Sequence, residues 1–395
     1  MSGNEPLRAL LRLTRLSLTQ FRNYEALTWR PSARIFVLHG PNGSGKTNLL
    51  EALSLLVPGR GLRGARHAEL ARYGPGTTGA WAVAAQFDTP DGPLAIGTGT
   101  PPGATDRRAF LLDGKPPRSQ AEILSRLAAL WLTPGMDRLF LEAAASRRRF
   151  LDRLVWALQP GHTRELAAHD QAVAQRNRLL ADGRDEPAWL DGLEDAIARH
   201  AVAVTAARLA AASALTDALA DGAASPFPAA RIGLVCPVAD RLRVSPALAV
   251  EDWLRTALAA SRGEDRRTGG TGYGAHRADM ALADAATGTP AARASTGQQK
   301  ALLVSVILGH ATLVTALRGI GPLLLLDEPL VHLDRERRAA LLAALIRLPC
   351  TALLTGVDAE VFAPLGDRAE WLRTGGGQLT PHNLLHAPRY GPETL

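Results

Sequence analysis

The stretch Gly40-Pro-Asn-Gly-Ser-Gly-Lys-Thr47 decides the fold. It fits the pattern G-x-x-x-x-G-K-[ST] and follows an apolar run, ARIFVL at residues 33–38, which predicts a strand. Residues 47–57 have the periodicity of a helix. A strand, a glycine loop and a helix in this order predict a P-loop, whose backbone N–H groups surround a phosphate at a helix N-terminus.

Every residue of this loop is therefore a candidate contact to ATP. Lys46 is expected to reach the β- and γ-phosphate oxygens, and the Thr47 hydroxyl to bind Mg²⁺. Lysine occurs only at Lys46, Lys115 and Lys300 among 45 basic residues, so its presence at the required place favours the interpretation. The loop residues are Gly40, Pro41, Asn42, Gly43, Ser44, Gly45, Lys46 and Thr47.

A second motif lies far along the chain, in the run LLLLDEP at residues 323–329. An apolar strand that ends in two carboxylates is typical of ATPases, where the first holds Mg²⁺ and the second polarises the attacking water. We therefore expect Asp327 to bind the metal and Glu328 to be the general base. Lys46 and Glu328 are the candidate catalytic residues.

The order of sequence textures predicts two lobes, as 395 residues suggest. Residues 1–118 read as strands and one helix, which form the N-terminal part of an ATPase lobe. Residues 119–262 are rich in Ala, Leu, Arg and Glu at helical spacing, and we expect an inserted helical lobe there. Residues 263–395 return to strands and helices and complete the ATPase lobe.

Composition predicts a packed protein of the cytoplasm with no membrane span. Hydrophobic residues make up 46% and charged residues 21%, and no uninterrupted apolar stretch is long enough to cross a bilayer. Cys236 and Cys350 form no CxxC pair, so they indicate neither a disulfide framework nor a cysteine zinc site. The net charge of +7 favours polyanionic partners, although charge alone is a weak signal.

The run STGQQK at residues 295–300 resembles the signature motif of ABC ATPases. This resemblance implies an ABC-type head in which Ser295, Gly297 and Gln298 bind the γ-phosphate held by a partner subunit. Alone, the run would be read as a helix cap. The segment LVHLD, residues 330–334, resembles the family's D-loop and makes Asp334 a candidate at the dimer interface. Asp358 stands at the switch position, where transporter ATPases usually have histidine.

Further motifs resemble the RecF family of ABC-type heads, which is related to SMC proteins. They are FRNY at residues 21–24, NLLEALSLLVPGRGLR at 48–63, RRRFLD at 147–152 and GAHRADM at 274–280. The resemblance implies that Arg22 and Asn23 contact nucleotide phosphates, although a strand-end turn explains them equally well. Gly135 and Ala275 depart from the family, which has an acidic residue and a proline there.

Two clusters stay open at this stage. The three arginines at 147–149 are expected to form a solvated helix face rather than a DNA patch. For the turn at residues 276–279, a hydrogen-bonding role in the core and a contact to DNA are equally consistent with the sequence.

The family resemblance implies a weak, DNA-stimulated ATPase that forms an ATP-dependent homodimer on single-stranded, double-stranded or gapped DNA. It also implies work with RecO and RecR, help in placing RecA at single-strand gaps, and links to replication restart and the SOS response. The alternatives are the ATP-binding subunit of a transporter and a long DNA tether. The long segment between Lys46 and Ser295 disfavours the first, and the lack of sustained heptads disfavours the second.

Overall fold

In the computed structural model, the P-loop begins where strand β3 (Ile35–His39) ends, within a six-stranded sheet. The strand order is β13-β12-β3-β11-β10-β7, and all neighbours run parallel except β12 and β13. Parallel strands covered on both faces are apolar throughout, which explains the fully buried runs of β3, β10 and β11. The other strands are β7 (Ala129–Leu132), β10 (Leu323–Leu326), β11 (Thr351–Gly356), β12 (Ala369–Gly375) and β13 (Gln378–Pro381).

A second, antiparallel sheet has the order β2-β1-β4-β5-β6. Buried and exposed positions alternate along its strand β4, as expected when one face packs on a core and the other is open. Strands were expected within residues 1–118, and β2 follows β1 after a turn of only two residues. The strands are β1 (Arg12–Phe21), β2 (Tyr24–Trp29), β4 (Ala82–Thr89), β5 (Gly92–Gly99) and β6 (Ala109–Leu112).

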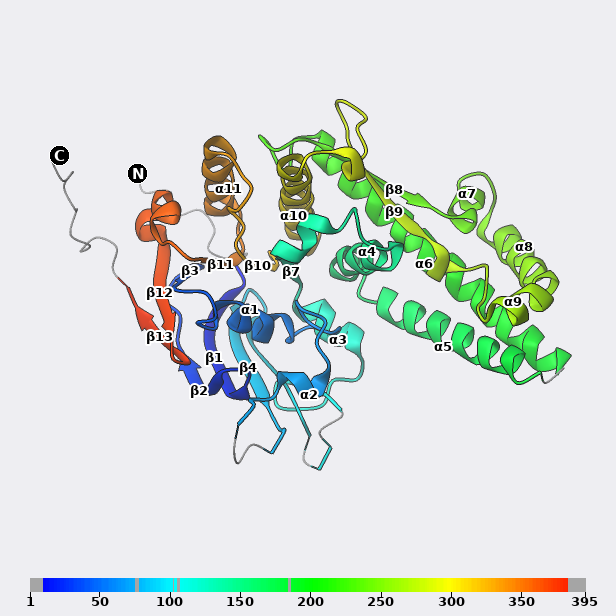
Figure 1. Ribbon diagram of the computed structural model, residues 1–395, viewed down its shortest axis with the longest axis horizontal. Helices are drawn as coiled ribbons and strands as arrows, with labels where there is room; N and C mark the ends of the chain where they lie inside the picture. Colours follow the sequence, from blue (N-terminus) through cyan, green and yellow to red (C-terminus); the bar gives the residue numbers. More distant parts are fainter. Residues whose placement is uncertain (1–9, 75–77, 102, 105–106, 184–185, 383–395) are drawn as a thin grey trace. The chain divides into compact units, whose positions relative to one another are not determined.

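The structure describes residues 10–74, 78–101, 103–104, 107–183 and 186–382. The chain divides into two compact units (Figure 1). Unit 1 comprises Met1–Arg118, Arg126–Met136 and Val314–Leu395 and contains both large sheets. Unit 2 comprises Ser119–Ser125 and Asp137–Leu313.

Unit 2 is mainly helical, with one two-stranded sheet formed by β8 (Ala230–Val235) and β9 (Asp279–Asp284). Its long helix α6 (Pro187–Ala220) starts with Pro187. Proline suits the first helical turn because it lacks a backbone N–H, and an N–H at that position would have no partner within the helix. The remaining helices of the chain are α1 (Lys46–Ser54), α2 (His67–Leu70), α3 (Gln120–Arg126), α4 (Ala144–Leu158), α5 (His162–Ala181), α7 (Pro237–Leu242), α8 (Ala247–Ala260), α9 (Arg262–Thr268), α10 (Thr296–Arg318) and α11 (Arg335–Arg347), with short 3-10 turns η2 (Pro134–Arg138), η3 (Ala275–Arg277), η4 (Ala291–Arg293) and η5 (Glu360–Arg368).

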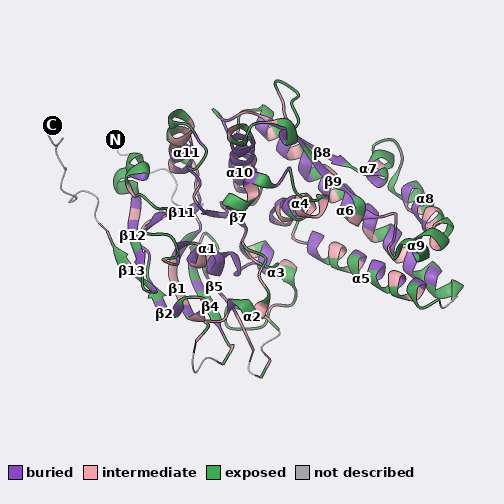
Figure 2. Ribbon diagram, viewed as in Figure 1, coloured by how far each residue is buried: buried purple, intermediate pink, exposed green. Residues whose placement is uncertain are grey.

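Among the described residues, α6 and α10 are long and apolar enough to cross a membrane. Figure 2 shows buried residues along both helices. In the most apolar 18-residue stretch of each helix, 72% of α10 and 44% of α6 is buried inside the protein. A core helix of a soluble protein can have the same length and composition as a membrane span.

The units differ in their limits from the lobes expected from sequence. Residues 126–136 lie in unit 1, because β7 pairs with β10 at the edge of the parallel sheet. Four apolar residues, ALWL, are too short a run for periodicity to separate strand from helix. Unit 2 continues to Leu313, because β9 pairs with β8, and the expected lobe limit between residues 262 and 263 falls within helix α9.

An ion pair lies in the core of unit 2, between α4 and α6. The Arg208 guanidinium donates to both carboxylate oxygens of Asp152, at 2.7 and 2.8 Å, and to the backbone oxygen of Ala275 at 2.7 Å. His162 contacts the same carboxylate at 2.9 Å. Burial acts to raise the pKa of Asp152, but the hydrogen bonds from His162 and Arg208 together hold it below its usual value.

We expect Arg208→Met to destabilise unit 2 by about 3–5 kcal/mol, because Asp152 then stays charged and buried without its main partner. Urea unfolding followed by far-UV circular dichroism measures the loss. The double variant Asp152→Leu/Arg208→Met removes both charges and should recover most of it. A single variant that unfolds at the wild-type midpoint would contradict this account.

Candidate functional site

The P-loop backbone adopts conformations that only glycine tolerates well. Gly45 has φ +106°, and a Cβ there would lie 2.5 Å from the Asn23 side chain. The Tyr24 hydroxyl donates to the Gly45 carbonyl at 3.1 Å, so the turn between β1 and β2 buttresses the loop from outside. Helix α1 then begins without a side-chain cap, which leaves its first N–H groups available to an anion.

Lys46 is the cation of this loop. The residue is 5% exposed, and its ammonium donates to the carbonyls of Gly40 at 2.7 Å and Pro41 at 3.0 Å. Burial lowers the pKa of Lys46, while the carboxylates of Glu328 and Asp327 act in the opposite direction. The ammonium therefore lies against the loop where a terminal phosphate would be bound.

Asp327, at the end of β10, meets the P-loop directly. The Thr47 hydroxyl lies 3.0 and 3.1 Å from its two carboxylate oxygens. A hydroxyl and a carboxylate are hard oxygen donors of the kind that Mg²⁺ prefers, so this pair fits the metal. The two motifs that the sequence placed far apart are thus brought together within unit 1.

Thr355, on β11 between β3 and β10, connects the two carboxylate residues. Its hydroxyl donates to Asp327 at 2.7 Å and accepts the backbone N–H of Glu328 at 2.9 Å. Glu328 has φ +48°, a left-handed conformation that costs a non-glycine residue energy and needs support from its surroundings. Sequence reasoning missed Thr355 because an apolar run gives no sign that its one hydroxyl faces a carboxylate.

Arg22 and Asn23 both lie at the loop, in different ways. The Arg22 guanidinium forms two bonds of 2.8 Å with Glu51, a fully buried carboxylate on α1, and a third with the Glu69 carbonyl. Asn23 accepts from Asn48 at 2.7 Å. The structure therefore shows Arg22 as a clamp on α1, while the phosphate contacts of both residues stay predictions.

Arg63 is a neighbour that the sequence analysis did not single out. It donates to Asn48 at 2.7 Å and lies 3.5 Å from Glu51, while 42% of its side chain is exposed. It lies in the GRGLR segment that resembles the RecF family. This resemblance is the one sign in the sequence that could have pointed to Arg63.

The signature segment lies in unit 2, at the start of α10. The Ser295 N–H donates to the Gln298 side chain at 2.9 Å, and the Ser295 hydroxyl accepts the Gln298 N–H at 3.4 Å. This reciprocal pair is a capping box. Gly297 lies in the same first turn, and Lys300 is fully buried with its ammonium 2.8 Å from Asp137.

The remaining candidates occupy ordinary structural positions. Asp334 caps α11, where its carboxylate accepts the Arg337 N–H at 2.8 Å. Asp358 is exposed after β11, and Gly135 lies in the short turn η2. Their functional roles stay predictions.

The expectation of a solvated arginine face is wrong for two of the three arginines. Arg147 forms two bonds, of 2.7 and 2.8 Å, with Asp279, and Arg148 donates to the Ala278 carbonyl at 2.7 Å. Only Arg149 is exposed. The RRRFLD and GAHRADM motifs are thus partners in one contact, which periodicity along a single helix cannot reveal.

Comparisons with known proteins agree on the family to which this chain is similar. Residues 12–353 match the family model for the RecF/RecN/SMC N-terminal domain. DNA replication and repair protein RecF of Mesorhizobium japonicum is 44% identical over 373 residues, which covers 93% of this chain and 97% of that protein. RecF of Agrobacterium fabrum is 44% identical over 372 residues, with 93% and 98% covered.

Solved structures agree at the level of the fold. The recombination mediator protein RecF-ATPrS of the RecFOR pathway superposes with a TM-score of 0.82 at 19% identity, covering 95% of this chain and 99% of that one. An SMC head domain from Pyrococcus furiosus gives 0.53 at 16% identity, covering 95% and 97%. The expected α/β head with a helical insertion is confirmed.

The sheets, the P-loop and the Thr47–Asp327 pair define an ATP-binding head of the class shared by RecF, RecN and SMC proteins. Within that class, the chain belongs to the RecF family of DNA replication and repair proteins. This membership favours a role in DNA replication and repair over the alternative of a transporter's ATP-binding subunit.

We expect Arg22→Met to lower the free energy of unfolding in the absence of nucleotide by about 1.5–3 kcal/mol, because a hydrogen-bonded charge on Glu51 loses its closer partner. Urea titration measures this. Asn23→Ala, in the same turn but without a buried ionic partner, is the control and should change stability little. If Arg22→Met keeps wild-type stability and loses only nucleotide affinity, Arg22 is a phosphate contact rather than a clamp.

Proposed function

We propose that the chain binds ATP with Mg²⁺ and hydrolyses it weakly, as an ATP-dependent DNA-binding switch in recombinational repair and replication restart. The observation that carries the ATPase part is the joining of Thr47, Asp327, Thr355 and Glu328 in one hydrogen-bonded chain. The name of the RecF-ATP structure, of the same fold at 20% identity, supports the choice of nucleotide.

Each residue has a separate task in this proposal. The loop amides at the start of α1 and the Lys46 ammonium hold the phosphates, after the ammonium exchanges its bonds to the Gly40 and Pro41 carbonyls for phosphate oxygens. Thr47 and Asp327 hold Mg²⁺, which supplies charge neutralisation when bound. Glu328, whose backbone Thr355 fixes, accepts the proton of the attacking water.

The signature and D-loop residues complete the site from a second copy of the chain. Ser295 and the first amides of α10 form a helix N-terminus that suits a γ-phosphate. The helix cap uses only a lone pair of the Ser295 hydroxyl oxygen, so the hydroxyl hydrogen can still be donated to a phosphate oxygen. Gly297 and Gln298 follow Ser295 in the first turn of α10 and bind the same phosphate, and Asp334 lies along the interface. The ATP-bound form is therefore a homodimer.

DNA is the partner that the family and the charge support. The relatives are named for DNA replication and repair, and the net charge of +7 suits a polyanion. We infer that the dimer binds single-stranded, double-stranded and gapped DNA, works with RecO and RecR, and helps to place RecA at gaps, with a link to the SOS response. The RecFOR pathway in the names of two solved structures supports these partners. We place the protein in the cytoplasm, where this DNA lies.

We expect Glu328→Gln to bind ATP and Mg²⁺ but to hydrolyse ATP roughly 10² to 10⁴ times more slowly, because general-base assistance is lost. Lys46→Ala is the contrasting variant and should fail to bind ATP tightly. Calorimetry gives the affinities, and phosphate release with and without gapped DNA gives the rates. Wild-type turnover by Glu328→Gln would show that another group is the base, and unchanged affinity of Lys46→Ala would overturn the P-loop assignment.

We expect Ser295→Arg to bind ATP as a monomer with nearly normal affinity but to form no dimer, because a bulky side chain then fills the place of the partner's phosphate. Its DNA binding should keep only the weak, steeply salt-dependent part. Sedimentation with ATP and Mg²⁺, together with a salt titration of DNA binding, tests both effects. A stable ATP-dependent dimer of this variant would refute the trans site.

A further inference from the structure

Two arginines and two aromatic residues of unit 2 lie close together, with the two rings between the two arginines. The Arg241 guanidinium lies 4.1 Å from the centre of the Trp253 ring. The Trp253 and Tyr273 rings meet edge to face, with centres 6.0 Å apart. Arg277 donates to the Gly272 carbonyl, which belongs to the peptide joined to Tyr273, at 3.3 Å. We call Arg241, Trp253, Tyr273 and Arg277 the cation–aromatic row.

The row is open to solvent. Both arginines are exposed and both aromatic residues are partly exposed. In an edge-to-face pair, whichever ring presents its edge, at least one face of Tyr273 is left uncovered by Trp253. The acidic residues nearest in sequence are already bound elsewhere, since Asp240 pairs with Arg243 and Asp252 with Arg255.

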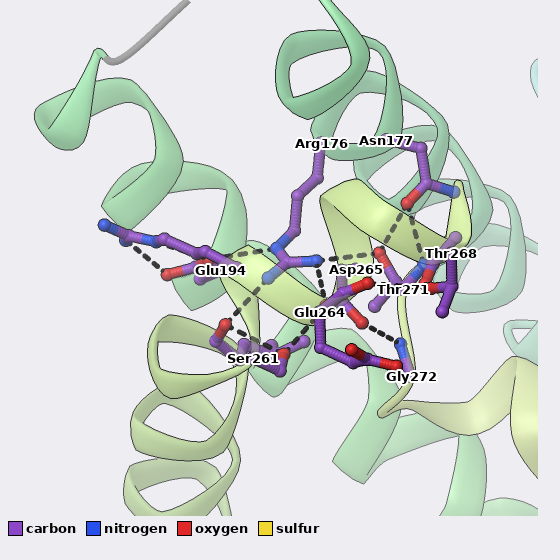
Figure 3. A network of polar contacts seen from close by, with 12 residues as sticks. Arg176, Asn177, Glu194, Ser261, Glu264, Asp265, Thr268, Thr271 and Gly272 are labelled. Carbon is purple, nitrogen blue, oxygen red and sulfur yellow. Dashed lines mark hydrogen bonds and ion pairs between the residues drawn. The ribbon is translucent and has the colours of Figure 1, made fainter. Parts of the chain in front are cut away.

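The loop that carries Tyr273 and Arg277 begins with Thr271 and Gly272, which belong to a buried network of polar contacts (Figure 3). Arg176 on α5 is fully buried and donates to Glu194, Asp265 and the Thr271 hydroxyl, at 2.9, 2.7 and 3.0 Å. Asp265 in turn accepts the Gly272 N–H at 2.9 Å, and Asn177 accepts the Thr271 N–H at 2.9 Å. The backbone just before Tyr273 is therefore held at several points.

The far side of the loop is fixed equally firmly. Arg208 and Arg148 donate to the carbonyls of Ala275 and Ala278, each at 2.7 Å. Gly274 has φ +133°, and a Cβ there would lie 3.0 Å from both His169 and His276. Buried arginines contribute little net stability compared with apolar packing. Their concentration under one surface loop points to the importance of the loop's position.

We propose that the cation–aromatic row binds single-stranded DNA, with a base stacked on Tyr273 and phosphates held by Arg277 and Arg241. Rigid aromatic faces between cations suit unstacked bases joined by phosphates. A duplex keeps its bases stacked on one another, so it can use the arginines but not the ring. The proposal rests on the DNA-binding function above and assigns part of it to this surface.

The test compares a fluorescein-labelled oligo-dT with a duplex of equal length, using the full chain with ATP and Mg²⁺. Tyr273→Ala should weaken oligo-dT binding roughly 5- to 150-fold, the range expected for loss of one stacked base, while duplex binding changes less than about twofold. Tyr273→Phe should bind both DNAs as the wild type does. Arg277→Ala should weaken both and reduce the salt dependence by about one phosphate contact.

Arg231→Ala is the matched control, because it removes an exposed charge of the same unit on β8, outside the row. ATP turnover without DNA should be unchanged in all four variants, which shows that the fold is intact. Equal oligo-dT binding by Tyr273→Ala and the wild type, or equal losses for Arg231→Ala and Arg277→Ala, would overturn the proposal while the proposed function stands. A wild-type protein that binds neither DNA would refute both.

Discussion

The Thr355 hydroxyl is the contact on which the geometry of the nucleotide site depends. Parallel strands end at the same edge of a sheet, and β11 lies between β3, which leads into the P-loop, and β10, which ends at Asp327. One small hydroxyl therefore bonds to the carboxylate of Asp327 and to the backbone of Glu328 at once. Valine would match its shape and make neither bond.

The sequence predicted the elements that carry the P-loop and Asp327 better than it predicted the chain's division into units. The P-loop and the run ending in Asp327 have fixed spacings set by phosphate and metal chemistry, so each could be recognised alone. β7 could not, because four apolar residues carry no periodicity, and its strand character comes from pairing with β10. Thr355 and the Arg22–Glu51 pair also depend on contacts between distant segments, which one sequence read alone does not contain.

The arginines show a second limit of reading charge from sequence. The high arginine content suggests a solvated, polyanion-binding surface, yet Arg176 and Arg208 are buried and Arg147 and Arg148 are bound to the turn at residues 278–279. A guanidinium presents several donors in a fixed plane, so one side chain can connect three backbone or carboxylate groups in a core. Net charge thus overstates the cationic surface that unit 2 offers to a partner.

The capping box at the start of α10 limits which residues can replace Ser295. Helix initiation needs only an oxygen acceptor there, a task that Asp or Asn performs as well as Ser. Recognition of an incoming anion needs a hydrogen donor that carries no negative charge. The Ser295 hydroxyl accepts the Gln298 N–H through a lone pair, and its proton would serve the second task in the proposed dimer. If Ser295 meets a phosphate as proposed, an aspartate at this position would preserve the helix and repel that phosphate, so the fold would tolerate a substitution that the proposed chemistry would reject.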